Sequence, residues 1–155
     1  MGFPDLPEVL AIERVSFPNP WPESTFQGEI QNRGISSPLV AVEEKTGTVI
    51  GYIIYWKIID EVQVNNVAVH PAHRRRGLAE ALFREVLENL RAEGAKSISL
   101  EVRTSNAAAR RLYEKLGFEP WGVRKGYYSN PDEDGLVLGL SLSEARGGSA
   151  PGGGS

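Results

Sequence analysis

Residues 64–82 read VNNVAVHPAHRRRGLAEAL, and this stretch decides the fold. The valines before His70 predict a β-strand, and the apolar residues that recur at helical spacing after Gly77 predict an amphipathic helix. A helix N-terminus presents unpaired backbone N–H groups and the positive end of its dipole, so this unit suits a phosphate if the backbone can be approached closely. Gly77 permits that approach, and the arginines at 74–76 could add charge-assisted bonds. A solvated basic loop explains the same pattern equally well.

The flanking segments predict further strands and helices on both sides of this unit. Before it we expect helices over 5–14 and 22–32, then strands over 39–44, 48–59 and 61–69. After it we expect a helix over 78–93, a strand over 97–103, a helix over 106–116 and strands over 118–128 and 135–142. This order of elements predicts an α/β (α+β) fold.

The composition is that of one ordinary domain. The chain has 155 residues, a formal net charge of −3 and 41% hydrophobic residues, which is enough for one sizeable core. We expect a single domain over residues 1–143 and a disordered Gly/Ser-rich tail over residues 144–155. No run approaches the roughly 18 apolar residues of a membrane span. No secretory signal opens the chain either, so we expect a cytoplasmic protein with no membrane partner.

Charge, cysteine and histidine content exclude several function classes. An acidic net charge argues against a nucleic-acid surface, which needs a basic domain. Residues 70–125 nevertheless carry five more basic than acidic residues, so a pocket for a small polyanion remains an alternative to solvated helix faces. The absence of cysteine excludes a covalent thioester on the protein. His70 and His73 share one loop without a suitably spaced third ligand, so no metal is expected.

Three runs together resemble a known family. They are residues 64–79, the long pattern LEVRTSNAAARRLYEKLGF at 100–118, and GYY at 126–128. These runs resemble the GNAT superfamily of acetyl-CoA-dependent N-acetyltransferases, and within it the RimI-type ribosomal-protein-alanine N-acetyltransferases. The likeness covers about residues 5–142. It implies a mixed central β-sheet flanked by helices, in which a central parallel strand pair forms the acetyl-CoA site.

The resemblance also implies which residues bind the co-substrate acetyl-CoA. The pantetheine arm would pair with the backbone of Val67, Ala68 and Val69. The pyrophosphate would be held around Arg74, Arg75, Arg76, Gly77, Leu78, Ala79 and Glu80. Asn106 would contact acetyl-CoA from the start of its helix, although it suits a helix N-cap as well. Glu80 departs from the expected pattern, since a carboxylate is a poor neighbour for a phosphate.

The catalytic residues are implied in the same way. The family's general base matches Glu101 and its general acid matches Tyr113. Without the family, Glu101 would pass for a solvated residue on the polar face of a strand. Tyr113 shares an apolar helix stripe with Leu112 and Leu116, and would pass for a core tyrosine.

The expected reaction is acetyl transfer, within a ternary complex, to the N-terminal α-amino group of a protein, an alanine-starting ribosomal protein in the RimI-type enzymes. The resemblance places the substrate near Trp21, Tyr127 and Tyr128, for which aromatic packing is an equal alternative. Acetylation of a lysine or a small amine, and a non-catalytic CoA-binding module, stay open as alternatives. Members of the superfamily open with a strand before the first helix, yet only Met1 to Pro4 precede Asp5 here. Either the chain start is truncated or the sheet begins one strand late, which could expose an edge.

Overall fold

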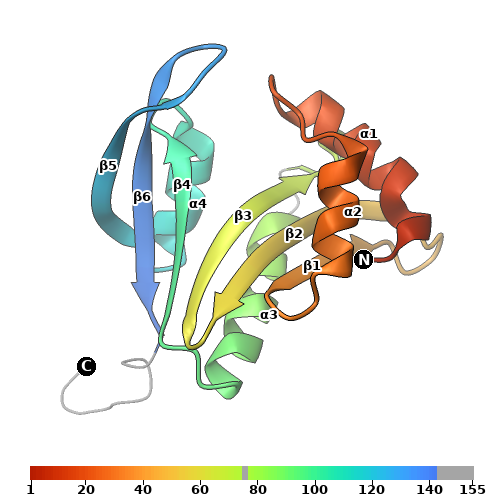
Figure 1. The fold of residues 1–155 in the computed structure, drawn as a ribbon, viewed down its shortest axis with the longest axis horizontal. Helices are drawn as coiled ribbons and strands as arrows, with labels where there is room; N and C mark the ends of the chain where they lie inside the picture. Colours follow the sequence, from red (N-terminus) through yellow and green to blue (C-terminus); the bar gives the residue numbers. More distant parts are fainter. Residues whose placement is uncertain (75–76, 143–155) are drawn as a thin grey trace. The chain divides into compact units, whose positions relative to one another are not determined.

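The computed structural model of the chain describes residues 1–74 and 77–142 (Figure 1). These residues form two compact units. Unit 1 consists of Met1–Lys57 and Val64–Leu82, and unit 2 of Ile58–Gln63 and the described residues from Phe83 onward. The predictions for Arg75, Arg76 and residues 144–155 lie outside the described part of the chain. The expectation of one domain over residues 1–143 stays a prediction.

Unit 1 packs two helices on the strands that begin the sheet. Its elements are α1 (Leu6–Ser16), α2 (Glu23–Gln31), β1 (Ser36–Val42), β2 (Val49–Ile58) and most of β3 (Glu61–Val69). The register of β1 on β2 is antiparallel. The core is formed by apolar residues of both helices and of β2 and β3, namely Leu6, Val9, Leu10, Ile12, Phe26, Ile30, Val49, Tyr52, Ile54 and Ala68. Burial of this face stabilises the two short helices, because isolated helices of this length are marginal in water.

Prolines set the helix boundaries in unit 1. α1 ends at Ser16, and the following segment carries Pro18, Pro20 and Pro22, none of which can continue a helix interior. Pro22 stands at the N-cap position of α2. The predicted break between the two helices is therefore present, with each boundary within two residues of the expected one.

The first residues lie beside β1 rather than forming a strand. Phe3–Asp5 forms a 3₁₀ turn, and the Met1 ammonium donates to the Pro38 carbonyl oxygen at 3.0 Å. Arg33 in turn donates to the Met1 carbonyl oxygen at 2.9 Å. β1 is the outer strand of the sheet, so the chain start occupies part of an edge that would otherwise be open.

Unit 2 contains the remaining strands and two helices, α3 (Leu78–Ala92, which begins in unit 1) and α4 (Ala107–Lys115). The start of β3 pairs in parallel with β4 (Ser97–Arg103), over Glu61–Gln63 and Ser97–Ser99. β6 (Glu133–Ser141) is antiparallel to both β4 and β5 (Glu119–Tyr128). The helices end before Gly94 and Gly117, whose φ values of +84° and +101° suit glycine alone.

The six strands of the described residues are hydrogen-bonded in the order β1-β2-β3-β4-β6-β5. The predicted fold class is therefore confirmed, as a mixed sheet with helices and a central parallel pair. β3 and β4 have the predicted bounds, whereas β1 begins at Ser36, three residues earlier than predicted. Pro38 lies inside it, which an outer strand tolerates because one of its backbone edges lacks a strand partner. Within residues 1–74 and 77–142, none of the helices has the length and apolar character to span a bilayer.

Candidate active site

Val67, Ala68 and Val69, the predicted pantetheine-binding residues, form the end of β3 in unit 1. The strand end is held to β2, because the His70 N–H donates to the Ile50 carbonyl oxygen at 2.8 Å. Gly51 of β2 allows this close approach, since a Cβ there would lie 3.2 Å from the Ala68 carbonyl oxygen. The backbone of β3 is thus fixed in place before the loop that follows.

The loop after β3 is organised by its own side chains. His70 caps the short 3₁₀ turn Pro71–His73, its Nδ1 accepting from the Ala72 N–H at 3.0 Å. Arg74 Nε donates to the Val69 carbonyl oxygen at 3.0 Å, and its Nη2 to Ser16 Oγ at 2.9 Å. The structure thus uses part of the Arg74 guanidinium to tie the loop to β3 and α1, a role that the sequence did not indicate.

The start of α3 has the geometry of an anion-binding turn. Gly77 has a φ of +72°, a conformation that side chains rarely adopt, and the helix begins at the next residue. Its carbonyl oxygen accepts the N–H of Ala81 at 2.9 Å. The N–H groups of Leu78, Ala79 and Glu80 belong to the first turn, where a helix supplies no internal acceptor. They are the donors that an anion at this helix end would use.

Glu101 lies on the partly exposed face of β4 in unit 2. Ile98, Leu100 and Val102 on the other face are buried, as the alternation predicts. The Glu101 side chain is 14% exposed, and its Oε2 accepts from Arg124 Nη1 of β5 at 3.2 Å. It is therefore neither the freely solvated residue of the alternative interpretation nor a fully buried one.

Tyr113 of α4 is buried among aromatic rings. Its ring centroid lies 5.3 Å from that of Phe83 and 5.6 Å from that of Phe118. Burial raises the pKa of Tyr113, and the nearby hydroxyl of Tyr128 raises it further. The phenol keeps its proton throughout the physiological range. Packing in the core and donation of a hydrogen bond are compatible uses of this residue.

Tyr127 and Tyr128, at the end of β5, form a pair in unit 2. Their rings meet edge to face with centroids 4.9 Å apart. The Arg124 guanidinium lies over the Tyr127 ring at 4.4 Å from its centroid, and Arg103 of β4 lies over the Tyr128 ring at 4.6 Å. Burial raises the pKa of Tyr128 to about 12, with smaller contributions from Tyr127 and Glu101. Glu101, Tyr113, Tyr127 and Tyr128 are therefore gathered within one unit.

Asn106 and Trp21 have the structural roles that the sequence offered as alternatives to ligand binding, namely a helix N-cap and aromatic packing. Asn106 is the N-cap of α4, its Oδ1 accepting from the Ala109 N–H at 3.1 Å, which leaves its amide N–H groups as donors. Trp21 belongs to unit 1, where its ring packs on Phe26 with centroids 5.3 Å apart. Its backbone N–H donates to Glu13 Oε2 at 2.9 Å. Aromatic packing is thus a demonstrated role of Trp21, whereas substrate contact stays a prediction.

Three polar residues of unit 2, Arg103, Arg124 and Glu133, were not predicted from the sequence. Arg124 pairs with Glu101, and Arg103 pairs with Glu133 at 3.3 Å. These partners come from β4, β5 and β6, whose lateral order is not readable from periodicity. The alternation of β4 was the only signal, since it places Glu101 and Arg103 on one face. Among residues 1–74 and 77–142, no three metal-ligating side chains lie close together.

Comparisons with known proteins identify the family of the chain. The acetyltransferase (GNAT) family pattern matches residues 6–118. A Bacillus subtilis (strain 168) protein provisionally named ribosomal protein bS18-alanine N-acetyltransferase is 38% identical, covering 93% of this chain and 94% of its own. The Escherichia coli (strain K12) protein of that name is 36% identical, covering 90% and 93%.

A solved structure agrees as well. The crystal structure of the ribosomal-protein-S18-alanine N-acetyltransferase from Escherichia coli superposes with a TM-score of 0.84 at 33% identity, covering 93% of this chain and 92% of that one. The match to the family extends over more than half of the chain and includes the end of β3, the turn at Gly77, Glu101 and Tyr113. The chain therefore belongs to the acetyltransferase (GNAT) family and is an acetyl-CoA-dependent N-acetyltransferase.

Proposed function

We propose that this enzyme acetylates the N-terminal α-amino group of a protein, and that its acceptor is a ribosomal protein that begins with alanine. The observation that carries the proposal is the identity of 38% and 36% to two relatives of that name, over nine-tenths or more of each chain. A cytoplasmic location, where ribosomal proteins are made, is part of the proposal.

The residues of unit 1 suit the binding of acetyl-CoA. The positive φ of Gly77 and the first-turn N–H groups of α3 suit a pyrophosphate. The backbone of Val67 at the end of β3 can pair with the amides of the pantetheine arm. The carbonyl oxygen of Val69 already accepts from Arg74, so it contributes less to that pairing. When bound, acetyl-CoA supplies the acetyl thioester.

Glu101 is the proposed general base. Acetyl transfer needs a neutral amine, whose nitrogen forms a bond to the acetyl carbon as the carbon–sulfur bond breaks. The amine then carries a surplus proton, which Glu101 accepts directly or through a water. Its partial exposure and its partner Arg124 leave carboxylate lone pairs open for this proton.

Tyr113 is the proposed acid. Its raised pKa keeps the phenol protonated, so it donates a hydrogen bond to the departing sulfur. Because that pKa lies above the roughly 8.5 of a thiol, complete proton transfer from Tyr113 is uphill. If the sulfur does take the proton of Tyr113, the phenol regains a proton from solvent. Glu101 releases the proton of the amine into the same solvent, so the protons balance.

The choice of an α-amine follows from proton affinity. An α-amino group has a pKa of about 7.8 and a lysine side chain one of about 10.4, a difference worth about 3.5 kcal/mol in the cost of deprotonation. A single carboxylate with one arginine partner gives modest assistance of the kind that an α-amine needs. The acidic residues outside positions 70–125 would favour approach of a basic ribosomal protein.

Mass spectrometry of peptides incubated with the enzyme and acetyl-CoA tests the proposal. One peptide has a free N-terminal alanine followed by a basic sequence, and the second is the same peptide with a blocked N-terminus and an internal lysine. We expect one acetyl group on the first peptide and none on the second. Acetylation of the blocked peptide would favour lysine acetylation instead. Binding of acetyl-CoA in calorimetry without any product would favour a non-catalytic module.

A further inference from the structure

The tip of the β5–β6 hairpin lies where the regular ladder is interrupted. The pairing passes from Arg124 with Gly135 to Tyr128 with Glu133, so β5 carries two extra residues in this interval. Gly126 occupies the bulge with a φ of +60°. β5 is the outer strand of the sheet and its first nine residues are exposed. The regular ladder is therefore broken over residues 125–127, and these residues are exposed.

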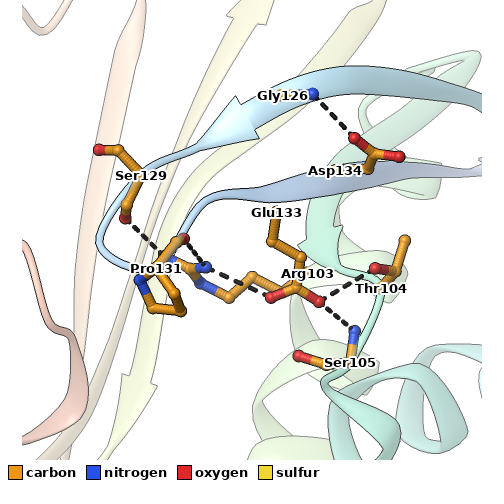
Figure 2. Close-up of polar contacts among 8 residues, drawn as sticks. All are labelled: Arg103, Thr104, Ser105, Gly126, Ser129, Pro131, Glu133 and Asp134. Carbon is orange, nitrogen blue, oxygen red and sulfur yellow. Dashed lines mark hydrogen bonds and ion pairs between the residues drawn. The ribbon is translucent and has the colours of Figure 1, made fainter.

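Arg103 of β4 holds the tip instead (Figure 2). Its Nη1 donates to the Pro131 carbonyl oxygen at 2.8 Å and to Glu133 Oε1 at 3.3 Å. Its Nη2 donates to the Ser129 carbonyl oxygen at 3.0 Å. The same guanidinium lies over the ring of Tyr128. One planar guanidinium therefore binds two carbonyl oxygens of the turn and the carboxylate of Glu133, and it also covers one of the two tyrosine rings.

Glu133 of β6 completes the connection from the other side. Its Oε2 accepts from the Ser105 N–H at 2.6 Å and from Thr104 Oγ1 at 3.0 Å, as Figure 2 shows. Both donors lie in the loop between β4 and α4, the helix that carries Tyr113. An isolated surface ion pair contributes little. Here, however, Arg103 and Glu133 are only 19% and 17% exposed and share a network of hydrogen bonds.

The network lies next to the proposed base. Arg103 and Glu101 are two residues apart in β4, so their side chains leave the same face of the strand. The turn that Arg103 holds directly follows Tyr127 and Tyr128. The ring of Tyr127 lies against Arg124, the partner of Glu101. The Arg103–Glu133 pair, which we call the hairpin clamp, thus contacts both the turn that follows the tyrosine pair and the ring of Tyr128.

We propose that the hairpin clamp is a positioning device for the acceptor, in which Arg103 and Glu133 set the place of Tyr127 and Tyr128 and so the affinity for the peptide N-terminus. This inference rests on the proposed function, because it assigns the tyrosine pair to the acceptor. The clamp lies in unit 2, whereas the proposed pyrophosphate and pantetheine residues lie in unit 1. Breaking it should weaken the use of the peptide without weakening the use of acetyl-CoA.

Steady-state kinetics of the full chain with Arg103→Lys and Glu133→Gln test the clamp. Lysine keeps the charge but lacks the planar fork that reaches several acceptors, and glutamine keeps the shape but loses the charge. We expect each variant to raise the KM for the alanine-starting peptide about tenfold, while the KM for acetyl-CoA changes less than about twofold. Lys125→Ala is the control, since Lys125 lies on the same hairpin, is 86% exposed, and forms an exposed pair with Asp134 at 3.3 Å.

Hydrogen exchange gives a second readout that needs no substrate. Amides of residues 126–134 should exchange about tenfold faster in the two clamp variants than in the control, while those of β4 stay protected. If the unmodified enzyme acetylates no peptide, the proposed function fails, and exchange alone then reports whether the clamp orders the tyrosine pair.

Three results would overturn the inference. The first is an equal rise of both KM values, which would mean that the clamp does not act on the acceptor alone. The second is a fall in kcat alone, which would indicate general destabilisation. The third is exchange at residues 126–134 that matches the control, which would mean that the tip is ordered without Arg103 and Glu133.

Discussion

Two glutamates, one in each compact unit, carry their carboxylates in very different surroundings. Glu13 of α1 is 1% exposed. Its Oε1 accepts from the Tyr52 hydroxyl at 2.5 Å and from Asn66 Nδ2 at 2.8 Å, and its Oε2 accepts from the Trp21 N–H at 2.9 Å. Donors from β2, β3 and the α1–α2 loop therefore surround it, and it fixes these elements to one another.

Glu101 is the opposite case. It is 14% exposed and is paired with Arg124, itself half exposed, at 3.2 Å. The comparison shows that burial alone does not mark a functional carboxylate. A carboxylate whose oxygens are filled by fixed donors holds structure together, whereas one with open lone pairs at the surface of a site can accept a proton.

Replacing the proposed base should give the largest effect. Glu101→Gln removes the group that accepts the proton, so we expect kcat to fall about a thousandfold. The free energy of unfolding should change by less than about 1 kcal/mol, because glutamine keeps the shape of the side chain and the lost ion pair is with Arg124, which is itself half exposed. Initial rates on the alanine-starting peptide and urea unfolding measure the two quantities. Glu119→Gln, at the exposed start of β5, is the matched control. A variant that keeps its rate would remove Glu101 from the mechanism.

Replacing the buried carboxylate should have the reverse outcome. Glu13→Gln exchanges one acceptor oxygen for an N–H donor that faces other donors, so we expect a loss of about 3 kcal/mol in the free energy of unfolding. The kcat of the folded fraction should stay within about twofold of the original. Urea unfolding followed by tryptophan fluorescence measures the loss, with the exposed Glu23→Gln as control. An unchanged unfolding midpoint would show that the three donors find other partners.

Two buried tyrosines extend the comparison. Tyr113→Phe keeps the packing on Phe83 and Phe118 but removes the proposed donor, so kcat should fall about a hundredfold while acetyl-CoA binding is retained. Tyr52→Phe removes a donor to Glu13, so it should cost about 2 kcal/mol of stability and little rate. Calorimetry with acetyl-CoA and steady-state rates separate the two effects. Equal loss of rate in both variants would contradict separate roles.

Much of the fold can be predicted from the sequence, because buried positions recur at every second residue in a strand and at helical spacing in a helix. β3 and β4 have their predicted bounds, and Gly94 and Gly117 follow the two helices that they were expected to end. The start of β1 was not predicted, because Pro38 indicates a strand break unless the strand is known to be an outer one. Lateral order within the sheet depends on long-range pairing, which local patterns do not encode.

The candidate site is harder to predict from the sequence. Glu101 and Tyr113 were identified by resemblance, since their own neighbours in sequence describe a polar strand face and a core helix. Arg124 and Glu133 could not be found, because their distance from β4 depends on the lateral order β4-β6-β5 and on the register of those strands, neither of which local periodicity encodes. A residue whose role depends on a bulged, distant strand leaves no periodic trace in the sequence.

The smallest expected effect concerns Glu133, a third carboxylate that combines features of the other two. The hydroxyl and N–H of Ser105, the hydroxyl of Thr104 and the guanidinium of Arg103 hold the pKa of Glu133 at about 2, below its ordinary 4.5. A group with a lowered pKa stabilises the fold at a pH above its ordinary value and loses that contribution as the pH falls toward the folded value.

The urea midpoint of the unmodified enzyme should therefore exceed that of Glu133→Gln by a constant amount above about pH 5, and the gap should narrow between about pH 4.5 and 2. Asp134, whose pKa is lowered mainly by the Gly126 N–H and raised to a lesser extent by the charge of Glu133, is present in both proteins, so most of its contribution cancels in the difference. A gap that stays constant down to pH 2 would mean that the charge of Glu133 is not what ties the hairpin to the loop before α4. The clamp would then act through Arg103 and the turn carbonyl groups alone.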